Sequence, residues 1–194
     1  MPVTQLDPVA ALVAIDLQKG ILAIPKAHPI EHILERTAAL AQAFRKRGLP
    51  VVLVNVTGAA PGRTDAGRRN HALPPGWDEL APELDAQSGD LLISKQRWGA
   101  FIGTALDAEL RARGVTQIVL AGVATSIGVE STARSAHELG YNVVLAVDAM
   151  TDLEAEAHRF TVEKIFPRLG EVDTTENVLK MLAEQPTALP AQAE

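Results

Sequence analysis

Apolar runs alternate with helical patterns along the chain. Five runs rich in Val, Ile, Leu and Ala predict buried strands at 9–15, 51–56, 91–94, 117–121 and 142–147, and a short edge strand is expected at 171–172. Helical spacing of apolar residues predicts helices at 30–47, 104–113, 127–139 and 175–183. The run Thr151-Asp152-Leu153-Glu154 has capping-box spacing and predicts one further helix, which reaches Phe166.

Continuous apolar strands separated by helices predict an α/β fold with a parallel sheet covered on both faces. Right-handed crossovers favour a doubly wound open sheet of six strands in the order 3-2-1-4-5-6. A closed barrel would need eight strand–helix units, and the chain has room for about six. We expect residues 1–185 to form a single domain, followed by a flexible C-terminal tail at 186–194.

One stretch of the chain, residues 57–87, differs from this pattern because it is rich in Gly, Pro, Arg and Asp. Loops longer than about 12–15 residues inside a compact domain are usually functional or mobile. We therefore interpret residues 57–87 as a flap beside the functional site.

Composition excludes several classes of function. The 194 residues include no cysteine, which excludes a disulfide, a thiolate metal site and a cysteine nucleophile. A net charge of −6 and an aromatic content of 4% argue against binding to nucleic acid. The N-terminal residues show neither a signal peptide nor a membrane span. We expect a cytoplasmic protein that acts on a small molecule.

Candidate functional residues follow the predicted strands. Ligands of open parallel sheets bind outside the carboxyl ends of the strands, where the winding reverses, here between strands one and four. Asp16 follows the first strand, and a Gly-Val-Ala-Thr turn follows the fourth. Lys95 follows the third strand, and Arg97, Trp98 and Phe101 come shortly after it. Cations beside apolar rings suit a small, planar ligand that is anionic or carries a carbonyl group.

The turn after the fourth strand opens a helix, whose first backbone N–H groups can stabilise a developing negative oxygen. Thr125 and Ser126 lie in this turn and are predicted to cap the helix. The five histidines are scattered without metal-binding spacing, and no phosphate-binding glycine motif is present. Neither a metal nor a cofactor is expected.

Three stretches together resemble the isochorismatase-like hydrolases, a family that includes nicotinamidases and other cysteine amidohydrolases. They are ALVAIDLQKGI around Asp16, SKQRWGAFIGTALDAEL around Lys95, and VLAGVATSIGVESTARSAHELGYNVVLAVDAM around Gly128. The resemblance implies a catalytic Asp16 and Lys95, with Gly128 at the position of the family's catalytic Cys.

The same resemblance implies further features of the site and of the assembly. It places a cis peptide at Val123–Ala124 and implies a homodimer or homotetramer. The metal-binding loop of nicotinamidases has no counterpart after the second strand, so no metal is carried over. The substrate-binding residues expected on this basis are Arg97, Trp98, Phe101, Val123, Ala124, Thr125 and Ile127.

Glycine at position 128 leaves three hypotheses open, because a thioester route needs sulfur. The first is a hydrolase without a covalent intermediate, in which Asp16 is the general acid or base and Lys95 a positioning group; its substrate could be an ether, as in isochorismatases, or an amide or imide. The second is a pseudoenzyme that binds a small ligand or partner. The third is nucleophilic catalysis through Ser126 or Thr125.

Overall fold

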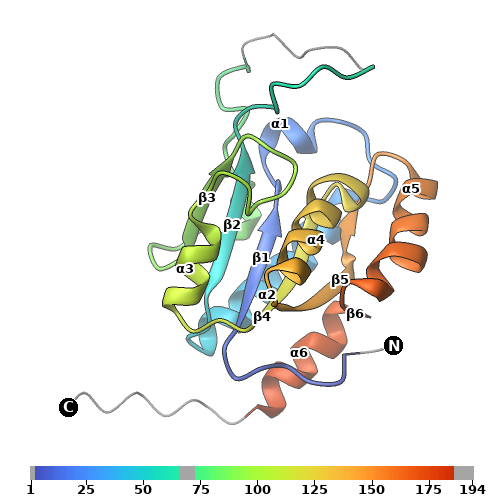
Figure 1. Cartoon of the computed structure of the whole chain (residues 1–194). Coiled ribbons are helices and arrows are strands. Elements are labelled where there is room, and N and C mark those ends of the chain that lie inside the picture. Colours follow the sequence, from blue (N-terminus) through green and yellow to red (C-terminus); the bar gives the residue numbers. More distant parts are fainter. Residues whose placement is uncertain (1–2, 66–72, 186–194) are drawn as a thin grey trace.

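The computed structural model describes residues 3–65 and 73–185, which form a doubly wound α/β fold (Figure 1). Its six parallel strands lie in the order β3-β2-β1-β4-β5-β6, so the predicted order is confirmed. The strands are β1 (Ala10–Ile15), β2 (Val51–Val56), β3 (Leu91–Lys95), β4 (Gln117–Val123), β5 (Asn142–Thr151) and β6 (Glu171–Asp173).

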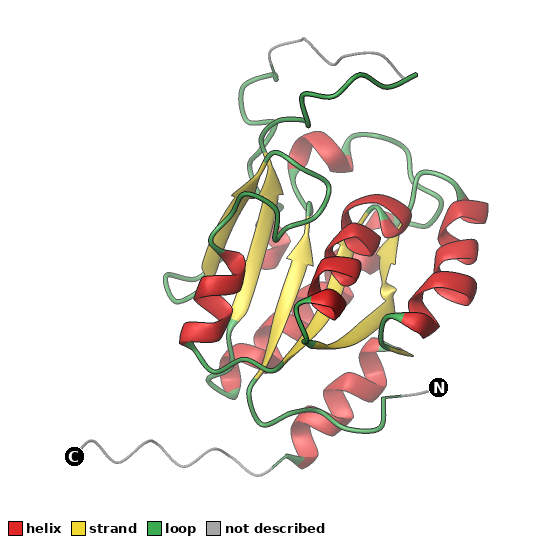
Figure 2. Ribbon diagram, viewed as in Figure 1, coloured by secondary structure: helices red, strands yellow, loops and turns green. Residues whose placement is uncertain are grey.

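Helices cover both faces of the sheet (Figure 2). The α-helices are α1 (Lys19–Leu22), α2 (Ile30–Lys46), α3 (Leu106–Ala112), α4 (Glu130–Glu138), α5 (Ala155–Phe160) and α6 (Thr175–Glu184). Short 3-10 helices η1 (Pro82–Leu84) and η4 (Phe166–Arg168) and the π-helical turns η2 (Thr125–Val129) and η3 (Thr161–Ile165) complete the fold.

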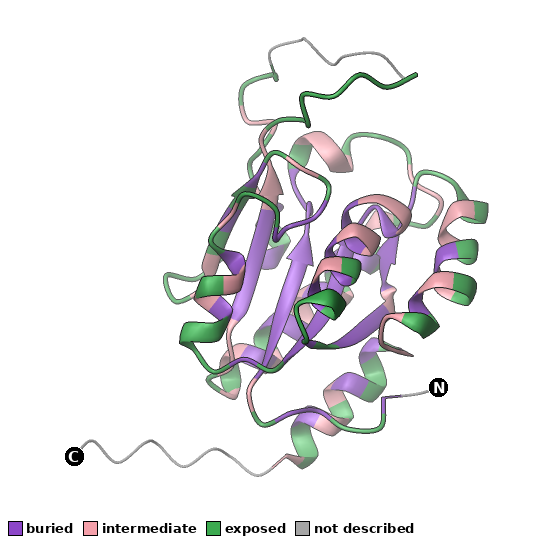
Figure 3. Ribbon diagram, viewed as in Figure 1, coloured by how far each residue is buried: buried purple, intermediate pink, exposed green. Residues whose placement is uncertain are grey.

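The two faces of the sheet bury separate apolar layers. Side chains of α2 and α6 pack on one face, and those of α3 and α4 pack on the other. Every residue of β1 and β4 is buried, because both strands are central and covered twice (Figure 3). The central strands therefore form a rigid support for whatever follows their carboxyl ends.

The junction of β1 and β4 requires a glycine. Ile15 of β1 pairs with Gly122 of β4, and a Cβ atom at position 122 would lie 2.1 Å from the Ile15 carbonyl oxygen. Gly122 also has φ +117°, which side-chain-bearing residues rarely adopt. This close approach brings the ends of β1 and β4 together, at the point where the winding of the sheet reverses.

The predicted capping box at 151–154 is wrong. Thr151 is the last residue of β5, which continues four residues beyond its predicted end, and no side chain among residues 3–65 and 73–185 caps α5. The Asp152 carboxylate instead accepts hydrogen bonds from Ser126 N–H (2.6 Å) and Leu153 N–H (2.7 Å). A local sequence motif is overridden here by a contact between segments that are distant in the chain.

Part of the predicted flap is docked on the core. Ala81 and Leu84 are 4% and 1% exposed, and Leu80 forms an antiparallel bridge with Gln18. Residues 66–72 of this segment and the predicted tail at 186–194 lie outside the described residues. Within 3–65 and 73–185, no helix combines the length and the apolar character that crossing a membrane requires.

Candidate active site

Asp16 turns the chain away from the end of β1. Its φ of +54° lies in the left-handed region, which Asp tolerates better than most side-chain-bearing residues. The backbone is held there because Asp16 N–H donates to the Val54 carbonyl (2.9 Å) and Gln18 N–H donates to the Asp16 carbonyl (2.9 Å). This turn leaves the Asp16 carboxylate buried at the carboxyl edge of the sheet, with the residue 6% exposed.

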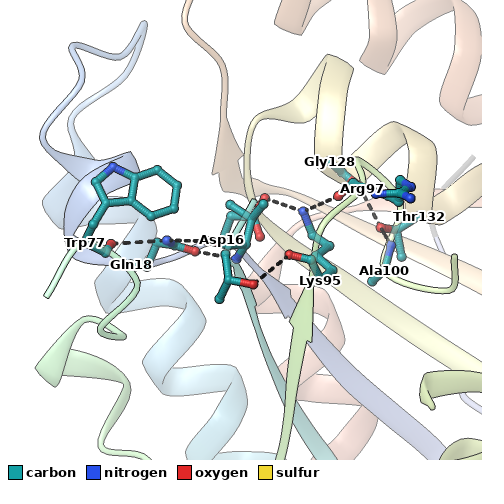
Figure 4. A network of polar contacts seen from close by, with 10 residues as sticks. Asp16, Gln18, Trp77, Lys95, Arg97, Ala100, Gly128 and Thr132 are labelled. Atoms are coloured by element: carbon teal, nitrogen blue, oxygen red, sulfur yellow. Dashed lines mark hydrogen bonds and ion pairs between the residues drawn. The ribbon is translucent and has the colours of Figure 1, made fainter. Parts of the chain in front are cut away.

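Lys95 ends β3 and reaches Asp16 across β2, which lies between β3 and β1 (Figure 4). Its Nζ atom donates to Asp16 Oδ2 at 2.7 Å and to the Arg97 carbonyl at 3.1 Å. Lys95 is 2% exposed, so the pair is shielded from water. Two predicted catalytic residues that are 79 positions apart thus form one buried ion pair.

The two oxygens of the Asp16 carboxylate differ. Oδ2 accepts from Lys95, whereas Oδ1 is buried and has no hydrogen-bond partner among the described residues. Burial raises the pKa of Asp16 to about 6, and the attraction and hydrogen bond of Lys95 oppose that rise. A buried carboxylate with a free oxygen and a pKa near neutrality suits proton transfer.

Gly128 lies directly beside this pair. A Cβ atom at position 128 would be 3.2 Å from Asp16 Oδ2, 3.0 Å from Ile15 Cγ2 and 3.4 Å from the Val123 carbonyl oxygen. The Val123–Ala124 peptide that leads into this turn is cis, as the resemblance implies. The structure therefore brings Asp16, Lys95 and Gly128 together.

The turn that carries Gly128 is not capped by its own hydroxyls, so the predicted capping role of Thr125 and Ser126 is wrong. The Ser126 N–H group is satisfied by Asp152, as described above. The Thr125 hydroxyl is buried and lies 2.8 Å from Nδ1 of His158 on α5. The turn is thus anchored from outside, by the end of β5 and by α5.

The other predicted substrate residues occupy varied environments. The Arg97 guanidinium donates to the neighbouring Gln96 carbonyl, and Trp98 is 64% exposed. Phe101 is buried in the core against Tyr141, with 5.7 Å between ring centroids. Tyr141 directly precedes β5.

Val123 and Ala124 are buried beneath the turn that carries Gly128. Ile127 is partly buried against the layer that contains α2. Val123 ends β4 and Ala124 follows it, whereas Ile127 lies in the same turn as Gly128.

Sequence reasoning missed Gln18 and its partner Trp77. Gln18 is fully buried, exchanges hydrogen bonds with the backbone of Val56, and donates to the Trp77 carbonyl (Figure 4). The Trp77 indole covers Gly20, where a Cβ atom would lie 2.0 Å from the ring. A buried Gln two residues after Asp16 was visible in the sequence, but its partners lie 38 and 59 positions away.

A pair of histidines was also missed, because the sequence shows them far apart. His28 and His158 make an edge contact with ring centroids 4.7 Å apart, and His28 Nδ1 lies 3.0 Å from the Thr151 hydroxyl. Burial and the neighbouring His28 lower the pKa of His158. In the part of the chain that the structure describes, no three His, Asp or Glu side chains are grouped so that they could hold a metal ion.

Comparisons with known proteins agree with this geometry. The isochorismatase domain model matches residues 10–177. The chain is 42% identical over 179 residues to the isochorismatase family protein YwoC of Bacillus subtilis (strain 168). This match covers 89% of this chain and 93% of YwoC. It is 32% identical over 164 residues to the ureidoacrylate amidohydrolase RutB of Variovorax paradoxus (strain S110), with 76% of this chain and 64% of RutB covered.

A solved structure of an isochorismatase family protein from Burkholderia thailandensis superposes on this chain with a TM-score of 0.88 and 44% sequence identity. The match covers 92% of this chain and 98% of that one. The fold, the family model and the relatives point to one assignment. The chain belongs to the isochorismatase family of hydrolases.

Proposed function

We propose that this protein hydrolyses an amide, imide or ether bond of a small organic molecule, with water as the nucleophile and Asp16 as the general acid and base. One observation carries the proposal. The buried Asp16 carboxylate is held by Lys95 through Oδ2, its Oδ1 has no partner in the described part of the chain, and it adjoins a residue without a side chain. This arrangement provides a proton acceptor, and Gly128 provides no covalent nucleophile.

The reaction balances with these groups alone, and for an ether the water oxygen bonds to carbon, the C–O bond breaks, and Asp16 returns the proton to the leaving oxygen. For an amide or imide, Asp16 takes one proton from water as the water oxygen bonds to the carbonyl carbon. The C–N bond then breaks, and Asp16 returns the proton to the leaving nitrogen, which regenerates the carboxylate. Lys95 keeps the carboxylate oriented and stabilises its ionised form. Gly128 places no side chain beside Asp16 Oδ2, and the Val123 carbonyl oxygen is also near the position where its Cβ atom would lie.

The electrostatics support this role for Asp16. A general base works best when its pKa lies near the working pH, and burial raises the pKa of Asp16 to about 6. An ordinary exposed aspartate, with a pKa of 3.8, would be a weaker base. The amidohydrolase RutB among the relatives supports a carbonyl–nitrogen bond as the first bond to test.

The test is a product screen by mass spectrometry. Ureidoacrylate, isochorismate and a set of small amides and imides are incubated with the wild-type protein and with Asp16→Asn. We expect turnover by the wild type and a loss of at least about 100-fold in Asp16→Asn, because an amide cannot accept the proton. Equal turnover by the two proteins would overturn the proposal.

A matched control is available at Asp85. This residue also has positive φ (+45°), is exposed, and lies on the 73–87 segment outside the Asp16–Lys95 pair. Asp85→Asn makes the same chemical change in a similar backbone conformation. It is expected to keep wild-type turnover, which would show that the loss in Asp16→Asn arises at the site.

A second candidate is a protein that binds a small ligand without turning it over. It is favoured by the mutual neutralisation of Asp16 and Lys95 in a site where both are almost fully buried. Ligand-induced stabilisation with no product in the screen would support this candidate over the hydrolase.

A further inference from the structure

Thr132 on α4 links two parts of the site that come from different elements (Figure 4). Its hydroxyl donates to the Gly128 carbonyl at 2.7 Å and accepts from Ala100 N–H at 3.1 Å. Thr132 is fully buried, so both hydrogen bonds are shielded from water. One oxygen thus connects the turn that carries Gly128 to the loop that follows β3.

The loop after β3 helps to orient Lys95. Besides Asp16, the acceptor of the Lys95 ammonium is the Arg97 carbonyl, three residues before Ala100. The same loop lies directly on α4, because a Cβ atom at Gly99 would be 3.2 Å from the Ser131 carbonyl oxygen. The position of the Arg97 carbonyl relative to Asp16 therefore depends on how this loop packs against α4.

We propose that Thr132 is a positioning residue for hydrolysis: its hydroxyl holds the Lys95-orienting loop in register with the turn that presents Gly128. The proposal rests on the function proposed above. Without the hydroxyl, Ala100 N–H and the Gly128 carbonyl lose a buried partner, which favours a shift of the loop. A displacement of about 1 Å at such a site lowers the rate, and when substrate contacts are kept the loss is in kcat.

The test compares Thr132→Val with a control at Thr37. Both threonines are fully buried, and the substitution replaces the same hydroxyl with a methyl group. The Thr37 hydroxyl, however, has no hydrogen-bond partner among the described residues. We expect Thr132→Val to lower kcat at least about tenfold with KM within about twofold, whereas Thr37→Val keeps wild-type kcat. Thr132→Ser retains the hydroxyl and should stay within about threefold of the wild type.

A second readout does not depend on turnover. The Asp16 carboxyl is titrated by carbon NMR in the wild type, Thr132→Val and Thr37→Val. Because a well-placed Lys95 stabilises the ionised carboxylate, its pKa should rise in Thr132→Val only. If the wild type hydrolyses nothing, the proposed function fails, while this titration still decides the role of Thr132.

Gly99→Ala provides an independent variant if Thr132→Val does not fold. The added methyl group would push the loop away from the Ser131 carbonyl oxygen. The substitution removes no hydrogen-bonding group. The same loss of kcat and the same rise of the Asp16 pKa are expected. Wild-type kcat and an unchanged titration, in Thr132→Val or in Gly99→Ala, would overturn the proposal.

Discussion

Asp16 and Gly128 depend on each other for their chemistry. The carboxylate needs burial to raise its pKa, a cation to hold one oxygen, and free space for the proton that it exchanges. Lys95 supplies the cation, and glycine at position 128 keeps a side chain away from the carboxylate, since a Cβ atom there would lie 3.2 Å from Oδ2. A methyl group at that position would crowd the carboxylate.

Gly128→Ala is therefore expected to lower activity while leaving the fold intact. The new Cβ atom would lie 3.0–3.4 Å from Ile15 Cγ2, Asp16 Oδ2 and the Val123 carbonyl oxygen, so these atoms must move by a few tenths of an ångström. We expect kcat/KM to fall at least about tenfold. Steady-state kinetics measure the fall, and urea denaturation checks stability, to which the better helix propensity of Ala adds up to about 1 kcal/mol. Unchanged kcat/KM would show that the activity does not require a residue without a side chain at position 128.

At the scale of elements, the site depends on how β1 and β4 meet. The pairing of Ile15 with Gly122 places the Asp16 turn next to the turn that follows β4. The second turn is then fixed by contacts from outside: Asp152 holds Ser126, and His158 holds Thr125. Rigid strands and external anchors thus preorganise a site that is made of turns.

Gly122→Ala should disrupt this junction. Its Cβ atom would lie 2.1 Å from the Ile15 carbonyl oxygen. Because this oxygen belongs to the backbone of a central strand, moving it away costs free energy. Overpacking and the positive φ together predict a loss of at least about 3 kcal/mol in the free energy of unfolding. Urea denaturation measures it. Gly114→Ala is the control, because that glycine has φ +68° with nothing within 4 Å of the added atom and should lose only about 1 kcal/mol. Similar losses in both variants would contradict the packing argument.

At the scale of the whole molecule, the sheet order was predictable because it follows from buried strands and right-handed crossovers. The same reasoning placed Asp16 and Lys95 at one edge, since the carboxyl ends of parallel strands lie together. The contacts of Asp152 and Thr132 were not predictable. The contact of Asp152 with Ser126 spans 26 residues and that of Thr132 with Ala100 spans 32, and no local pattern encodes which buried hydroxyl or carboxylate meets which backbone group.

Phe101 is a further residue whose packing contacts cannot be predicted from its position in the sequence. Its nearness to Lys95 in the sequence predicts a place beside the substrate, and that role stays a prediction; the contact that the sequence does not indicate is the one its ring makes with Tyr141. Side-chain direction depends on the packing of α3 and α4 against the sheet. Residue types near a strand end therefore indicate where a site lies better than they indicate which side chains line it.

Acid should not unfold the protein through Asp16. The folded state raises the pKa of this group from 3.8 to about 6. Protonation of Asp16 as the pH falls from about 6 to about 4 therefore favours the folded state. The free energy of unfolding that this group adds is lost again as the pH rises through about 6. Unfolding driven by protonation of Asp16 is therefore not expected to lower the activity in this pH window.

The most direct test is the dependence of kcat/KM on pH between 4 and 9, measured on the substrate that the screen identifies. A general base must be ionised, so the account predicts a tenfold fall per pH unit below about 6 and a plateau above it. Asp16→Asn should lose this limb along with most of its activity. A rate that is independent of pH from 4 to 8, or a limb that persists in Asp16→Asn, would contradict the central role of Asp16.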